Sequence, residues 1–360
     1  MNLFFWRKRK DKINPLYTEG LNLMLAGEHA SAMEKFRQIV KQDTENINAY
    51  NRLAELYRQT NRPKQALKIH LSLTIRTNLT DFQKVQVHRG LLEDWEALGK
   101  YHKALKIAEK LYSFQKNNLW TLKAQIRIYK KMNDWKSAHQ ILTQMLKIRH
   151  EDNKPLEALY LMQYGITLMQ QAQYSAARKQ FEHANHIDPN GAAPHLYSGN
   201  SYSRENNPEK AIEEWSKFAQ KDPENAFLVF EKIEKTYFEM GQFGRIAQFY
   251  ESVLRNDTDN VQATAGLADF YEKKGDTKSA LDLVERTLEL EPSSIRMRLL
   301  YSKLLNKIGE KPAVNQQIDN MLNIMSKTQV FICAECNFQS EDMLWLCPKC
   351  SAENSFHIQT

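Results

Sequence analysis

The chain has 360 residues, a formal net charge of +7 and 42% hydrophobic residues. It contains no apolar run of the roughly twenty residues that a membrane-spanning helix needs, and no apolar core typical of a signal peptide. All four cysteines lie between residues 333 and 350, which excludes a disulfide framework and predicts a reducing, cytoplasmic location.

The first predicted element is a basic segment, residues 1–12, which reads MNLFFWRKRKDK. Its candidate membrane-contact residues are Phe4, Phe5, Trp6, Arg7, Lys8, Arg9 and Lys10. An aromatic tip beside cations is typical of an interfacial anchor on anionic lipid. The alternative is a tail whose apolar residues cover the first helical hairpin. The anchor would place the chain peripherally at an anionic membrane.

Residues 13–325 form a repeat with a small or β-branched residue in the second half of each unit. These anchor positions are Ala32, Ala66, Ala104, Ala138, Ala177, Ala211, Ile246, Ala280 and Val314. Their intervals of 34 to 39 residues match the period of the tetratricopeptide repeat. The sequence therefore predicts an all-α, right-handed solenoid of about nine helical hairpins. The two longest intervals predict extended loops near Thr77–Lys84 and His150–Leu156.

Within the repeats, glycines and large side chains occupy fixed positions. Gly20 and Gly165 lie twelve residues before an anchor, where two helices must approach closely. Four residues after the anchors stand Phe36, Phe181, Trp215 and Tyr250, which we expect to fill the space between neighbouring hairpins. His70 holds the same position in the second repeat, so it is predicted to pack rather than to catalyse.

The first helices of the third to fifth hairpins carry the candidate partner-binding residues. Their inward positions hold Arg89 in the third hairpin, Lys123, Arg127 and Lys130 in the fourth, and Met162 and Met169 in the fifth. Residues 116–149 carry a net charge of +7, whereas residues 257–291 carry −5. A cationic stripe beside methionines predicts a groove for an acidic or amphipathic protein segment. The alternative is a face that is only solvated.

The last predicted element, residues 329–360, is a four-cysteine module. Cys333, Cys336, Cys347 and Cys350 read as C-x2-C, ten residues, C-x2-C. Two such pairs supply the four thiolates of a tetrahedral metal site. Because four thiolates leave no open coordination position, one structural metal ion is expected rather than a catalytic or redox one. Zinc and iron both suit these ligands, and the sequence does not separate them.

Two other functional classes are disfavoured. Lys349 is the one Lys or Arg between Phe331 and His357, against four acidic residues, whereas a phosphate-binding module should be basic. Nucleic acid is therefore not the expected partner. The chain also lacks Walker, dinucleotide-binding, H-E-x-x-H and G-x-S-x-G motifs, so no enzymatic activity is expected.

The order of parts, and above all the ending FICAECNFQSEDMLWLCPKC, resembles the lipopolysaccharide assembly protein B family. The aromatic-x-Cys opening, the Leu344-Trp345 pair and the Cys-Pro-x-Cys closure look like that family's rubredoxin-like module. The stretches LYTEGLNLMLAGEHASAMEKF and NRLAELYRQTNRPKQALKIH resemble its first two hairpins. The four cysteines match the family's metal ligands position for position.

The resemblance implies a non-enzymatic adaptor at the cytoplasmic face of the inner membrane of Gram-negative bacteria. Such adaptors regulate lipopolysaccharide synthesis by presenting the lipid A pathway deacetylase to the membrane protease FtsH. Two departures stand out: the usual N-terminal transmembrane helix is not seen, and Asn337 replaces a glycine. The alternatives are a general scaffold or co-chaperone with another protein client, and a nucleic-acid-associated zinc-ribbon protein.

Overall fold

The computed structural model describes residues 15–327, 331–340 and 342–358. The predicted membrane-contact residues 4–10 lie outside the described residues, so the N-terminal anchor stays a prediction. The chain divides into two compact units, Met1–Pro189 (unit 1) and Asn190–Thr360 (unit 2). Among the helices of the described ranges, none has both the length and the hydropathy to cross a bilayer.

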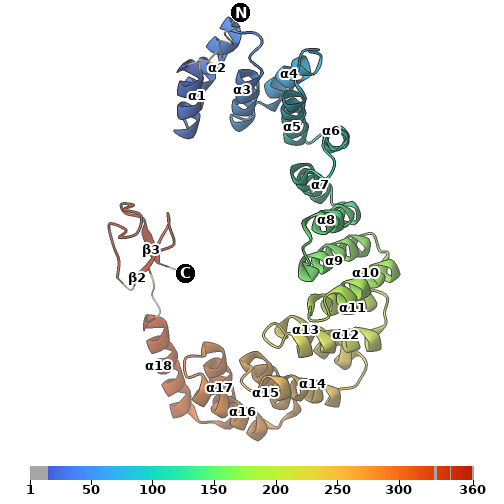
Figure 1. Cartoon of the computed structure of the whole chain (residues 1–360). Coiled ribbons are helices and arrows are strands. Elements are labelled where there is room, and N and C mark those ends of the chain that lie inside the picture. Colours follow the sequence, from blue (N-terminus) through green and yellow to red (C-terminus); the bar gives the residue numbers. More distant parts are fainter. Residues whose placement is uncertain (1–14, 328–330, 341, 359–360) are drawn as a thin grey trace, which may run out of the picture. The chain divides into compact units, whose positions relative to one another are not determined.

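The described part of unit 1 consists of five helical hairpins (Figure 1). Its helices are α1 (Pro15–Leu25), α2 (His29–Gln42), α3 (Ile47–Gln59), α4 (Pro63–Thr74), α5 (Asp81–Ala97), α6 (Tyr101–Phe114), α7 (Leu119–Lys131), α8 (Trp135–Arg149), α9 (Lys154–Gln170) and α10 (Tyr174–Ile187). Each helix packs mainly against its neighbours in the chain.

The described part of unit 2 consists of four further hairpins and a small sheet (Figure 1). Its helices are α11 (Ala193–Arg204), α12 (Pro208–Lys221), α13 (Phe227–Glu239), α14 (Gly244–Asn256), α15 (Val261–Lys274), α16 (Thr277–Leu290), α17 (Ile295–Ile308) and α18 (Lys311–Lys327). The strands are β1 (Phe331–Cys333), β2 (Gln339–Ser340) and β3 (Phe356–Ile358). The predicted fold class, a tetratricopeptide-repeat solenoid with a small four-cysteine knuckle, is confirmed.

The turn inside each hairpin requires a left-handed residue five positions before the anchor. Gly99 adopts φ +67° there and Gly275 adopts φ +87°. Where the sequence has no glycine, asparagine takes its place at Asn61 and Asn133, with φ 56° and 57°, and alanine does so at Ala172, with φ 59°. Asparagine tolerates this region better than most residues. The left-handed turn therefore recurs more regularly in the structure than glycine does in the sequence.

The extended loops predicted near Thr77–Lys84 and His150–Leu156 are only partly present. Helices α5 and α9 are each 17 residues long and take up much of both stretches. Thr80 and Gln83 form a capping box that starts α5 at Asp81. Asn153 accepts a hydrogen bond from the amide of Leu156, which starts α9. The prediction was right only in part, because these caps start α5 and α9 inside the two stretches.

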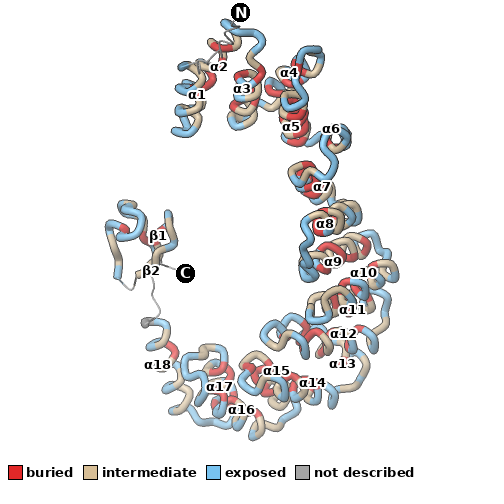
Figure 2. Tube along the Cα trace, in the orientation of Figure 1, coloured by how far each residue is buried: buried red, intermediate tan, exposed pale blue. Residues whose placement is uncertain are grey.

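The core follows the repeat, because the alanines at the anchor positions are completely buried. In Figure 2 the buried residues lie where helices face one another. A Cβ added to Gly20 would lie 2.9 Å from Cζ of Phe36, in the same hairpin. Only some of the large residues pack as predicted: Tyr250 reaches Gly266 of the next hairpin, whereas Phe36 fills its own. In both cases a glycine leaves the room that the ring occupies.

Gly165→Ala is expected to destabilise unit 1, because a Cβ there would meet Cε1 of the buried Phe181 ring at 2.4 Å. Overpacking costs about 1–3 kcal/mol, which exceeds the roughly 1 kcal/mol gained in helix propensity. Denaturant unfolding measures the difference. Gly244→Ala is the control, since nothing lies within 4 Å of its Cβ position. Equal stability of the two variants would contradict this packing argument.

Candidate functional site

The four-cysteine knuckle is built on a three-stranded antiparallel sheet in the order β2-β1-β3. Cys333 on β1 lies opposite Phe356 on β3. Cys333, Cys347 and Phe356 form its buried core, and Phe338 packs edge-on against Phe356 at a centroid distance of 6.4 Å. Few apolar side chains therefore hold this module together.

Both cysteine pairs sit in the same kind of turn. The amide of Asn337 donates to the carbonyl of Cys333 at 2.9 Å, and that of Ser351 donates to Cys347 at 2.8 Å. Both residues are left-handed, with φ 55° at Asn337 and 57° at Ser351. Asn337 thus adopts the conformation that a glycine in its place would supply. The repeated turn brings each pair of thiols to one side of its loop.

The four sulfur atoms converge on one point, since all lie within 4.8 Å of one another. Cys333 Sγ is 3.7 Å from Cys350 Sγ, and Cys336 Sγ is 3.6 Å from Cys347 Sγ. A tetrahedron with zinc–sulfur bonds of about 2.3 Å has edges of about 3.8 Å. The thiols therefore fit one tetrahedral metal ion, and the donor set suits zinc or iron equally.

The thiols differ in acidity. Ser355 Oγ, 3.1 Å from Cys333 Sγ, together with backbone amides, lowers the pKa of Cys333 to about 6. The Ala352 amide lowers the pKa of Cys350, but desolvation and the neighbouring thiols outweigh it and raise that pKa to about 12. Four adjacent thiolates repel one another, so a bound cation is what allows all four to lose their protons.

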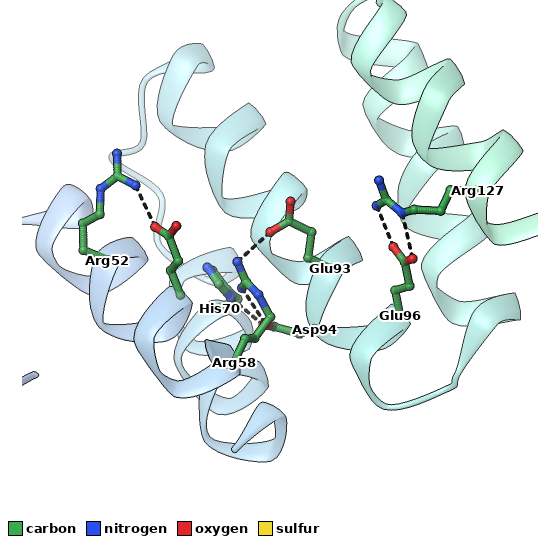
Figure 3. Close-up of polar contacts among 8 residues, drawn as sticks. Arg52, Arg58, His70, Glu93, Asp94, Glu96 and Arg127 are labelled. Atoms are coloured by element: carbon green, nitrogen blue, oxygen red, sulfur yellow. Dashed lines mark hydrogen bonds and ion pairs between the residues drawn. The ribbon is translucent and has the colours of Figure 1, made fainter. Parts of the chain in front are cut away.

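A buried ion-pair network joins the second and third hairpins of unit 1 (Figure 3). Asp94 on α5 is 0% exposed and accepts a hydrogen bond from Arg58 at 2.8 Å. Its second oxygen contacts Nδ1 of His70, which is 1% exposed. Arg58 also pairs with Glu93 at 2.6 Å. His70 is thus buried and held by Asp94, and it is among the residues that line a pocket in unit 1.

A second ion-pair group links the third and fourth hairpins (Figure 3). Glu96 is 7% exposed and accepts hydrogen bonds from Arg127 at 2.7 and 2.8 Å and from Lys131 at 2.9 Å. Burial would raise the pKa of Glu96, but these hydrogen bonds lower it below its usual value. Arg127 is therefore held in an ion pair, and among the described residues only Lys123 and Lys130 of the predicted cationic stripe have no carboxylate partner.

All three residues of the stripe, Lys123, Arg127 and Lys130, line a pocket of about 530 Å³ in unit 1. Lys123 is exposed, and Lys130 Nζ lies 5.7 Å from the Trp135 ring and 5.8 Å from the Tyr160 ring. These rings pack edge-on on α8 and α9. The pocket therefore combines cations with aromatic rings, which suits an amphipathic segment.

Met162 and Met169 are half-buried on α9 and are not among the residues that line this pocket. Sequence reasoning missed Trp135 and Tyr160, because they come from two helices and no single-helix pattern joins them. The one available signal was that both residues are aromatic. Arg89, the remaining predicted residue, lies over the ring of Trp120 in a separate pocket.

Comparison with known proteins finds tetratricopeptide repeats in two parts of the chain and relatives that it covers almost completely. The tetratricopeptide-repeat family model matches residues 23–80 and 237–304. Lipopolysaccharide assembly protein B of Escherichia coli strain K12 is 22% identical over 353 residues, covering 96% of this chain and 90% of that protein. The protein of the same name from Haemophilus influenzae is 22% identical over 363 residues, covering 94% and 88%.

Two solved structures each match about half of the chain. The crystal structure of MamA covers 47% of this chain and 92% of its own, with 18% identity and a TM-score of 0.34. That of YrrB, described as a TPR protein with an unusual peptide-binding site, covers 53% and 93%, with 20% identity and a TM-score of 0.34. The resemblance of this chain to lipopolysaccharide assembly protein B, stated from its sequence, is confirmed by the nearly full-length similarity.

Proposed function

We propose that this chain is a non-enzymatic adaptor in lipopolysaccharide synthesis that presents the lipid A pathway deacetylase to the membrane protease FtsH. The observation that carries the proposal is the similarity to lipopolysaccharide assembly protein B over 94–96% of the chain. That similarity covers nearly the whole chain at 22% identity. It is supported by a fold whose usual role is to bind other proteins.

In this proposal the hairpins bind the client and the knuckle is structural. Lys123 and Lys130, beside Trp135 and Tyr160, offer a client both charge and apolar contact area. Cys333, Cys336, Cys347 and Cys350 hold one zinc or iron ion, which supplies folding free energy to the module. Because four thiolates fill the coordination shell, we assign the ion no catalytic role.

The location proposed is the cytoplasm, with peripheral contact at the inner face of the inner membrane. Four cysteines that bind a metal ion and form no disulfide are typical of a reducing compartment. Contact with the bilayer surface would bring the adaptor close to a membrane-anchored protease.

Affinity purification of the full chain from its native cell tests the proposal. We expect the deacetylase and the protease among the bound proteins, identified by mass spectrometry. Recovery of an unrelated protein client, with neither enzyme, would favour a general scaffold or co-chaperone instead. Recovery of nucleic acid that salt releases would favour the zinc-ribbon alternative.

Reversing the two uncompensated lysines, Lys123→Glu and Lys130→Glu, is expected to weaken client binding about tenfold at low salt, through loss of charge attraction. Arg127 is kept, because its reversal would also break the pair with Glu96. Client binding is measured by surface plasmon resonance against the purified deacetylase.

The matched control is Lys64→Glu with Lys68→Glu, two exposed lysines of α4 in the same unit. This pair should bind as the parent does, while circular dichroism verifies that both double variants are folded. If the variant at positions 123 and 130 binds as tightly as the control, the client does not use this pocket.

A further inference from the structure

The pocket between α7, α8 and α9 in unit 1, here called the α7–α9 pocket, has the size and lining of a small-molecule site. Its volume is about 530 Å³, and such sites usually measure about 300–1,000 Å³. Its apolar lining residues come from all three helices and are Ile126, Trp135, Leu142, Met145, Leu156 and Tyr160. Ile126, Leu142 and Met145 are buried, so they form an apolar floor.

The charge in this pocket is positive. Its charged lining residues are Lys123, Arg127, Lys130 and Lys131, and none of the described lining residues is acidic. Glu96 pairs with Arg127 and Lys131 from outside the lining. Lys123 and Lys130 have no carboxylate of the described residues within ion-pair distance, so their charge is left over. An anionic group on a ligand would neutralise it.

The lining offers almost no hydrogen-bond acceptor. Its apolar residues lie inside helices, so their carbonyl groups already accept from the amide four residues later. Lysine and arginine side chains only donate, and the Trp135 indole N–H donates to Asn133 Oδ1 at 2.8 Å. The Tyr160 hydroxyl is the one side-chain oxygen among the described lining residues. The N–H groups of an extended peptide would therefore be buried on this floor without partners, whereas an acyl chain needs none.

We propose that the α7–α9 pocket binds a small anionic amphiphile, an acyl chain with a carboxylate or phosphate head. Lys123 and Lys130 bind the head, whose oxygens accept their hydrogen bonds. The chain lies on the floor formed by Ile126, Leu142 and Met145, where apolar area leaves water. A fatty acid supplies the carboxylate, and a single-chain phospholipid supplies the phosphate. The ligand is a small molecule, so this site goes beyond the adaptor function.

The ligand also has a consequence for the client. In the adaptor proposal the same two lysines, Lys123 and Lys130, contact the client, so a bound amphiphile and the client compete for them. This consequence rests on the proposed function, whereas the amphiphile site does not. It makes the affinity for the client depend on the concentration of free amphiphile.

Isothermal titration calorimetry of the full chain tests the site. The probes are dodecanoate, dodecyl phosphate, neutral dodecyl maltoside and cationic dodecyltrimethylammonium, each below the concentration at which it forms micelles. The two anions should bind at least about tenfold more tightly than the other two, as expected for charged hydrogen bonds. Acetate and inorganic phosphate, which lack the chain, should not bind detectably. Tighter binding of dodecanoate assigns a fatty acid, and tighter binding of dodecyl phosphate assigns a phospholipid.

Two variants separate the roles of head and chain. Lys123→Gln with Lys130→Gln should weaken both anions about tenfold and leave dodecyl maltoside unchanged. Leu156→Trp enlarges a half-buried lining residue and should weaken every ligand that has the chain. The matched control is Lys64→Gln with Lys68→Gln, exposed lysines of α4 outside the pocket. Circular dichroism verifies that each variant is folded.

Equal binding of anionic and neutral amphiphiles, no binding of either anion, or full binding by the variant at positions 123 and 130 would overturn the site. Saturating dodecyl phosphate should displace the purified deacetylase in surface plasmon resonance, and unchanged deacetylase binding would overturn the competition. The titrations contain no deacetylase, so they judge the site without the adaptor proposal. A deacetylase that does not bind the chain at all would count against the adaptor proposal alone.

Discussion

Cys347→Ser is expected to unfold the knuckle while the helical hairpins stay folded. Cys347 is buried, and its sulfur lies 3.6 Å from that of Cys336. Few apolar side chains pack in this module, so the apolar core alone does not supply the stability that a metal ion would give. A structural zinc site supplies about 10–16 kcal/mol at neutral pH, more than so small a core can offset. Elemental analysis should find one zinc or iron ion per parent chain and much less in the variant.

Hydrogen exchange locates the damage. Amides of residues 331–358 should exchange freely in Cys347→Ser, while far-UV circular dichroism keeps the helical signal. Lys349→Ser is the matched control, because it places a serine in the same turn and retains every thiol. A parent chain without metal, together with a variant as protected as the control, would refute the metal site.

Asp94→Ala is expected to destabilise unit 1 by about 3–5 kcal/mol, the usual cost of breaking a buried ion pair. The substitution leaves Arg58 with only Glu93 and removes the partner of the buried His70. Because these residues come from α3, α4 and α5, local unfolding should spread across the second and third hairpins. Denaturant unfolding and hydrogen exchange of those helices measure the loss.

Asp81→Ala supplies the comparison on the same helix. Asp81 is 98% exposed and pairs with Lys84 at 3.0 Å. An exposed pair contributes no more than about 1 kcal/mol. If the two variants lose the same stability, the buried network does not hold these hairpins together.

Much of the fold could be predicted because the tetratricopeptide pattern is local. A small anchor such as Ala32 and a left-handed turn residue such as Gly99 recur at fixed spacing, so the same pattern marks each hairpin. The first residues of α5 and α9 could not be predicted from the repeat period, because the N-caps Thr80 and Asn153 decide where these helices begin. The cysteine spacing likewise predicted that four thiols would converge.

The groove was harder to predict because its chemistry depends on pairs from different helices. The inward position of Arg127 gave no sign that Glu96, 31 residues earlier, would neutralise it. The sequence positions of Arg89 and Trp120 also did not show that the Arg89 guanidinium would lie over the Trp120 ring. Periodicity identifies which face of a helix points inward, whereas charge pairing across hairpins requires the packed structure.

Reconstituted proteolysis tests the central claim most directly. The deacetylase is incubated with the membrane protease in liposomes of anionic lipid, with and without the full chain, and its loss is followed by gel. The adaptor account predicts that the chain accelerates loss of the deacetylase, and that Lys123→Glu with Lys130→Glu reduces this acceleration. The same rate of loss with and without the chain would contradict it.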